Sequence, residues 1–206
     1  MLKVCLTIGV ALHAGCVSSR IAQKNERPRP SQSWGYFSGP VETRWDNDGL
    51  NMILLNELRY TDPSGVVWVA PAGSKVNGAS IPRAFWSLIG GPFDGKYRNA
   101  SVLHDVAYEQ KTHSWQEADR MFYNAMRCSG VGVVEAKTMY YALSRHGRHW
   151  QHPIRRATAA QPSDLAPPAE RATTVDPDEV DAIQKWIEEN NPSLEQIDER
   201  ALARSR

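Results

Sequence analysis

The chain has little cysteine, and its N-terminal apolar run is short. Its 206 residues include three cysteines, Cys5, Cys16 and Cys128, whereas a disulfide scaffold needs an even set at regular spacing. Residues 4–14 are mostly apolar, but eleven residues are too few to cross a bilayer, which takes about 20. The first shortage excludes an intrachain disulfide framework. The second makes residues 4–14 the hydrophobic segment of a signal peptide.

An excess of one charge is also missing, since the net charge is +1. That value hides a division along the chain. Residues 157–206 carry five Lys and Arg against eleven Asp and Glu, a net charge of −6, and residues 16–156 carry eighteen against twelve, a net charge of +6. A basic body could face anionic lipid headgroups. We favour the plainer interpretation of two solvated surfaces that attract each other weakly.

The end of the apolar run carries a motif. Residues 12–16 read Leu-His-Ala-Gly-Cys, which resembles the lipobox of bacterial lipoproteins, although His13 stands where an aliphatic residue is usual. The resemblance implies a signal peptide at residues 1–15, lipidation of Cys16, and a lipid-anchored protein of the bacterial cell envelope that faces the periplasm. The alternatives are an ordinary signal peptide and a short uncleaved anchor.

Hydrophobic periodicity and turn residues predict an α+β fold. Strands are expected at residues 36–45 and 50–60, joined by an Asp-Asn-Asp-Gly turn, and at residues 66–70. Helices are expected at residues 97–110, 114–128 and 133–150, and the second begins with a Ser114–Glu117 capping box. We therefore predict a small antiparallel β-meander followed by a three-helix unit.

The rest of the chain divides around this unit. The predicted segments are a signal peptide at 1–15, a tether at 16–33, the globular domain at 34–152, an Ala/Pro-rich linker at 153–175 and an acidic helical tail at 176–206. In the tail, residues 180, 183, 186 and 187 form one apolar stripe.

Two predicted helices carry a group of polar side chains. His104 and Tyr108 are four residues apart and share a helix face, and Asp119 falls on the apolar side of the next helix. A carboxylate aimed inward is costly unless it is paired. We expect Asp119 to orient His104 through Nδ1, which leaves Nε2 as a base, while Asp105 holds a cation. The alternative is a buried network that pairs the two helices.

Several motifs, in this order and spacing, resemble a family of phage and bacterial domains of unknown function. The resemblance spans about residues 52–150. It rests on the following motifs: Val-Ala-Pro-Ala-Gly-Ser-Lys-Val-Asn-Gly-Ala-Ser-Ile-Pro-Arg at 69–83, Gly-Pro-Phe at 91–93, His-Asp-Val-Ala-Tyr at 104–108, Glu-Ala-Asp-Arg-Met-Phe at 117–122, and Met-Tyr at 139–140. Val76-Asn77 stands where the family usually has Thr-Asp, which removes a carboxylate.

The His-Asp-Val-Ala-Tyr motif with its later Ala-Asp is also similar, more loosely, to the catalytic helices of phospholipase A(2) enzymes. The resemblance implies that His104 activates water, Asp105 binds calcium, and Tyr108 and Asp119 support the histidine. Backbone carbonyls of a glycine loop, at Gly91 and Gly95, would complete an oxygen shell of the kind that calcium accepts.

Two functions remain open from the sequence. One is a calcium-assisted hydrolase of phospholipid or another envelope ester, and the other is a non-catalytic envelope or phage-related binding or structural module. The hydrolase requires a solvent-open cleft at His104 and an Asp105 that points toward residues 90–95. The basic run after Arg145 is expected to be a solvated helix end, and no nucleic-acid partner is expected for an exported protein.

Overall fold

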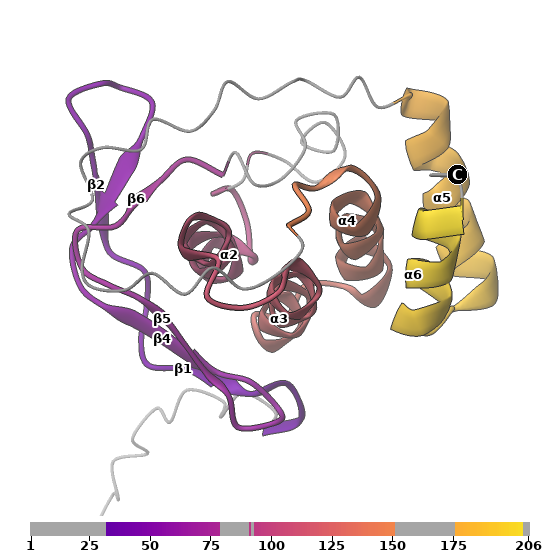
Figure 1. Cartoon of the computed structure of the whole chain (residues 1–206), viewed down its shortest axis with the longest axis horizontal. Helices are drawn as coiled ribbons and strands as arrows, with labels where there is room; N and C mark the ends of the chain where they lie inside the picture. The colour runs from indigo at the N-terminus through magenta and orange to yellow at the C-terminus, as the bar shows by residue number, and fades with distance from the viewer. Residues whose placement is uncertain (1–31, 79–90, 92, 151–175, 204–206) are drawn as a thin grey trace, which may run out of the picture.

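The computed structural model describes residues 32–78, 91, 93–150 and 176–203. Figure 1 shows the strands on one side of the molecule, α2 beside them, then α3 and α4, and the C-terminal helices on the far side. The α+β class is confirmed. Antiparallel strands precede the helices, as predicted, but they form two three-stranded sheets in the orders β1-β4-β5 and β2-β3-β6.

The two predicted long strands are each divided in two. The short strands are β1 (Tyr36–Phe37), β2 (Thr43–Trp45), β3 (Met52–Leu54), β4 (Leu58–Thr61), β5 (Val67–Ala70) and β6 (Lys75–Val76). β1 pairs with β4 and β2 pairs with β3, both antiparallel, so one bent hairpin contributes to both sheets. Pro40 lies at the bend between β1 and β2 and has no N–H for a ladder hydrogen bond.

Three helices pack behind the sheets. They are α2 (Arg98–Gln110), α3 (Trp115–Cys128) and α4 (Val133–His146), and a short 3₁₀ turn, η1 (Gln32–Trp34), precedes β1. The predicted capping box is confirmed, because the Ser114 side chain accepts from the Glu117 N–H and Glu117 accepts from the Ser114 N–H. The third helix ends at His146, four residues earlier than predicted. A Cβ at Gly147 would lie 2.5 Å from the Leu143 carbonyl oxygen, so only glycine fits this exit.

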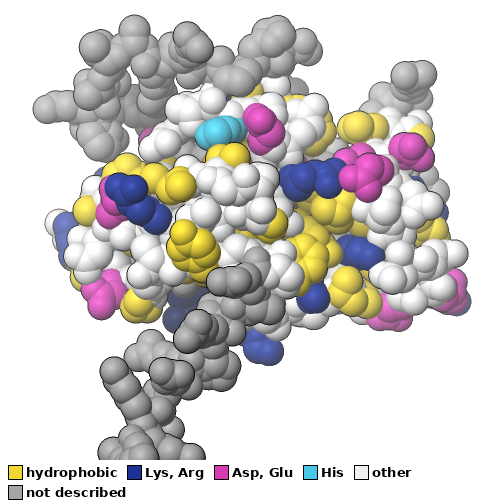
Figure 2. Space-filling view, turned by 90° about the horizontal axis from the view of Figure 1, so that it is seen from below, with side chains coloured by type: hydrophobic (Ala, Val, Ile, Leu, Met, Phe, Trp, Pro, Cys, Tyr) yellow, Lys and Arg dark blue, Asp and Glu magenta, His cyan; other side chains and the backbone are white. Residues whose placement is uncertain are grey.

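The C-terminal helices are packed against the body. α5 (Pro177–Asn190) and α6 (Leu194–Ala203) both contact α4, and they bury Val180, Ile183, Ile187, Ile197 and Ala201. The predicted helical tail is therefore present, and its apolar stripe packs on α4 while most of its acidic side chains within the described residues stay exposed. Figure 2 shows Lys or Arg side chains beside Asp or Glu side chains toward the tail side of the molecule.

Candidate functional site

The predicted polar group is assembled in the core between α2 and α3. His104 Nε2 lies 2.9 Å from Asp119 Oδ1, and the Tyr108 hydroxyl donates to the same oxygen at 2.5 Å. His104 and Asp119 have no exposed surface, and Tyr108 is 1% exposed. An ionised carboxylate can only accept hydrogen bonds, so the His104 Nε2–H and the Tyr108 O–H both donate to Asp119.

The predicted nitrogen of His104 was wrong. Asp119 faces Nε2, not Nδ1, and in a neutral imidazole the lone pair then lies on Nδ1. The helix period predicted that His104 and Tyr108 share a face, but it could not predict which ring nitrogen of His104 faces Asp119. A spacing of four puts His104 above Tyr108, with ring centroids 4.1 Å apart, whereas the rotation of the ring depends on contacts with α3.

Aromatic packing encloses the histidine. The His104 ring lies 4.7 Å from the Phe122 ring, centroid to centroid, on the opposite helix. Burial raises the pKa of Tyr108 well above its ordinary value, and the nearby Asp119 carboxylate raises it further. The phenol therefore keeps its proton and serves as a donor at any physiological pH.

Asp119 is only half satisfied. Its Oδ1 accepts two hydrogen bonds, whereas its Oδ2 is buried and makes no hydrogen bond in the described part of the chain. A buried acceptor without a donor costs about 1 to 3 kcal/mol. Such a cost is retained at functional sites more often than in ordinary cores.

Asp105 makes a contact that the sequence did not predict. Its Oδ2 accepts from the backbone N–H groups of Asn77, at 3.1 Å, and Gly78, at 2.6 Å. These residues directly follow β6, and Gly78 has a φ of +72° that favours glycine. Asp105 thus ties α2 to the end of the second sheet. The sequence did not reveal this contact because 27 and 28 residues separate the partners.

The two glycines predicted as calcium ligands have other roles in the described part of the chain. The Gly91 carbonyl, a predicted ligand, accepts the Tyr97 hydroxyl at 2.7 Å, and the Gly91 N–H donates to Asp94. Gly95 has a φ of +86° and forms a turn before α2. Within the described ranges, no group of three or more His, Cys, Asp or Glu side chains could hold a metal ion.

A cavity that the sequence did not predict lies near this network. A space of about 310 Å³ is lined by Trp115, Gln116, His149 and Trp150. The Trp150 ring packs edge-on against Tyr108, and the Trp115 and His149 rings stack with centroids 3.7 Å apart. The sequence feature that could have indicated this cavity is the adjacent pair His149 and Trp150, but we had assigned this stretch to a solvated helix end.

His146 and His149 do not form a pair, although their spacing allowed one. His146 Nε2 lies 3.7 Å from Glu179 of the tail, while His149 stacks on Trp115. Burial lowers the pKa of His146, and the opposing effect of Glu179 only partly offsets it. The two histidines therefore face different parts of the molecule.

The fold and the site define a small α+β domain whose central helix pair holds a buried His-Asp-Tyr network. A model of the family described as protein of unknown function, DUF1353, matches residues 52–143. This stretch runs from β3 into α4 and contains His104, Tyr108 and Asp119. It agrees with the first predicted resemblance. The comparisons give no support to the resemblance to phospholipases.

Two proteins of Sinorhizobium fredii (strain NBRC 101917 / NGR234) are similar to the chain. The uncharacterized protein y4jT is 42% identical over 116 residues, which cover 56% of this chain and 34% of the relative. The uncharacterized protein y4iH is 33% identical over 103 residues, which cover 50% and 43%. The chain thus spans less than half the length of either relative. No solved structure matches the chain.

Proposed function

We propose that the chain is a lipid-anchored protein of the bacterial envelope that acts by binding, and that its His104–Asp119–Tyr108 network holds two helices together. One observation carries the proposal. Asp119 Oδ1 accepts from both partners in a place where neither His104 nor Asp119 exposes any surface. A general base must reach a water or substrate proton within about 3 Å, and a fully enclosed imidazole is poorly placed to do so.

The contacts of Asp105 support the same conclusion. The Asp105 carboxylate accepts hydrogen bonds from two backbone N–H groups and so connects α2 to the end of the second sheet. Asp119 connects α2 to α3 in a similar way. Asp105 and Asp119, the two acids of the predicted site, therefore each connect two segments of the fold. Through these contacts, the residues that follow β6 are tied to α2, and α2 is tied to α3.

A direct assay separates this function from ester hydrolysis. Phospholipid vesicles incubated with the protein, with and without calcium, are expected to release no fatty acid above the blank, because His104 has no exposed surface. Calcium-dependent release that is lost in both His104→Ala and Asp105→Asn would contradict the proposal. Glu109→Gln is the matched control, since Glu109 is an exposed acid on the same helix.

A second candidate, a hydrolase that uses His104 as base, is favoured by one observation. Pairing of Nε2 with Asp119 puts the lone pair of a neutral ring on Nδ1, and an Asp-oriented histidine is the usual form of a general base. The substrate class would be a phospholipid or another envelope ester. The vesicle assay tests this candidate as well, and release that persists without calcium but disappears in His104→Ala would establish it.

The lipid anchor has its own test. In a bacterial host fed with labelled palmitate, the full chain is expected to carry the label and to sediment with membranes, and Cys16→Ser is expected to lose the label. Cys128→Ser is the control, because the Cys128 thiol donates to the Gly35 carbonyl in the folded domain. Label retained in Cys16→Ser would disprove lipidation at this residue.

Within the described residues, no helix is long and apolar enough to span a membrane.

A further inference from the structure

The tail helices have no core of their own. α5 and α6 both pack against α4, and the buried Ile183, Ile187, Ile197 and Ala201 belong to the hydrophobic cluster of the body. Between the two tail helices, the Arg200 guanidinium lies over the Trp186 ring. The helices have 14 and 10 residues, and isolated helices below about 12 to 15 residues are marginal in water. The helical form of the tail therefore depends on its docking to α4.

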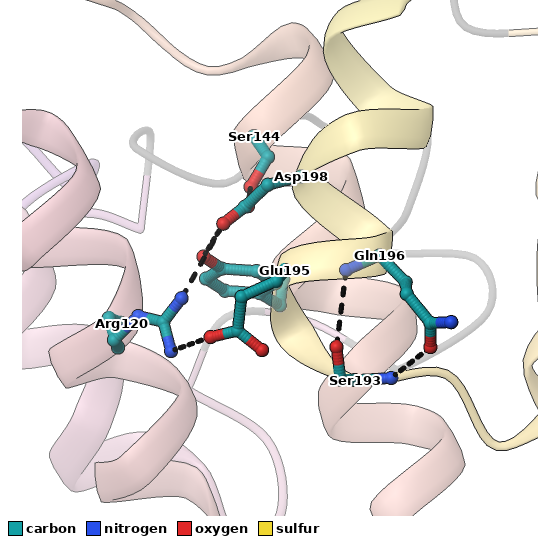
Figure 3. Close-up of polar contacts among 7 residues, drawn as sticks. Arg120, Ser144, Ser193, Glu195, Gln196 and Asp198 are labelled. Carbon is teal, nitrogen blue, oxygen red and sulfur yellow. Dashed lines mark hydrogen bonds and ion pairs between the residues drawn. The ribbon is translucent and has the colours of Figure 1, made fainter.

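One acidic side chain of the tail is held by three groups of the body. Asp198 accepts from the Tyr140 hydroxyl at 3.1 Å and the Ser144 hydroxyl at 3.2 Å, and it lies 3.5 Å from Arg120. Arg120 also pairs with Glu195 at 3.0 Å (Figure 3). Burial raises the pKa of Asp198, against the effect of these donors. The body thus presents an arginine and two hydroxyls to the carboxylates of α6.

A second acidic side chain is held in the same way at the other tail helix. Glu179 accepts from the Tyr141 hydroxyl at 2.9 Å and pairs with Arg145 at 2.8 Å. Arg145 also donates to the Ala201 carbonyl, and Lys137 donates to Asn191. Cations and hydroxyls of α3 and α4 therefore meet carboxylates and carbonyls of both tail helices around an apolar centre.

The tail lies outside the part of the chain that the family model matches. The match ends at residue 143, so it includes most of the docking face on α4 but neither α5 nor α6. In this chain, the 25 residues 151–175 stand between the body and the tail in sequence.

We propose that the α3–α4 face is a docking surface for acidic amphipathic helices, and that the tail of this chain occupies it and can be replaced by the tail of a second copy. The polar donors recognise the acidic face of the incoming helices, and the apolar centre receives Ile183, Ile187 and Ile197. This inference rests on the proposal that the domain acts by binding. Its test measures exchange of the tail, whereas the test of the proposed function measures fatty-acid release. One proposal can therefore fail while the other holds.

The experiment uses the full chain with a protease site placed in the linker at residues 151–175. After cleavage, the tail is expected to remain bound at low salt and to exchange with an added fluorescent peptide of residues 176–206. Affinity should fall as salt rises, because the ion pairs at the rim are screened. Asp198→Lys in the peptide is expected to weaken binding about 10-fold or more.

The matched control is Glu199→Lys, which makes the same charge change on α6 at an exposed residue. It is expected to weaken binding by less than about 2-fold. Arg120→Asp in the body is expected to restore binding of the Asp198→Lys peptide. A cleaved body that unfolds by circular dichroism, or a tail that never exchanges with the peptide, would overturn the proposal and make the tail a permanent part of the core.

Discussion

Replacing Asp119 with alanine is expected to lower the free energy of unfolding by about 3 to 5 kcal/mol. The substitution removes the acceptor of the Tyr108 hydroxyl and the partner of His104 Nε2, both of which stay buried. Guanidinium unfolding followed by tryptophan fluorescence measures the change. The large value follows from leaving two buried polar groups without their acceptor, not from the net strength of the hydrogen bonds.

Two comparison variants make this expectation specific. Glu109→Ala, an exposed acid on α2, is expected to change the free energy of unfolding by no more than about 0.5 kcal/mol. Asp119→Asn keeps an acceptor oxygen of the same size and is expected to lose less than the alanine variant. If Asp119→Ala unfolds at the denaturant concentration of the parent, the network does not hold the helices together.

Replacing Ile183 with aspartate is expected to detach the tail. Ile183 is 2% exposed and packs in the core cluster, and an unpaired charge there costs several kcal/mol. Because α5 and α6 have no core of their own, their 14 and 10 residues should lose helical structure. Circular dichroism at 222 nm measures the loss, while the unfolding transition of the body remains.

Ala182→Asp is the matched control, because it places the same charge one residue earlier at an exposed position. It should leave the circular dichroism spectrum unchanged. A collapse of the whole domain in Ile183→Asp would show that the body does not fold without the tail. An unchanged spectrum would show that the tail is helical by itself.

Local patterns predicted those features that depend on neighbours in the chain. The Ser114–Glu117 box starts α3 because both partners lie within one turn. Asp119 was expected to face inward because the apolar stripe of its helix surrounds it, and it is fully buried. The apolar stripe noted in the tail includes Val180, Ile183 and Ile187, and these three side chains are buried.

Features that depend on distant segments were not predicted. The resemblance to phospholipases directed Asp105 toward residues 90–95, whereas the described contacts of its Oδ2 are to Asn77 and Gly78. α4 ends at His146, where the backbone of Gly147 lies close to Leu143 and to the Tyr108 hydroxyl. A Cβ at residue 147 would lie 2.5 Å from the Leu143 carbonyl oxygen and 3.0 Å from the Tyr108 hydroxyl. Periodicity holds no information on such contacts.

By itself, the sequence determined the α+β class, the inward direction of Asp119 and the amphipathic tail, because helix period and capping are local physics. Only the tertiary structure decided which nitrogen of His104 meets Asp119, what Asp105 holds, and where the acidic tail lies. Those outcomes depend on packing between α2, α3 and α4, and on the cost of burying a charge without a partner. The sequence did not predict that arginines and hydroxyls of the body would pair with Glu179, Glu195 and Asp198 of the tail, whose other acidic side chains within the described residues remain exposed.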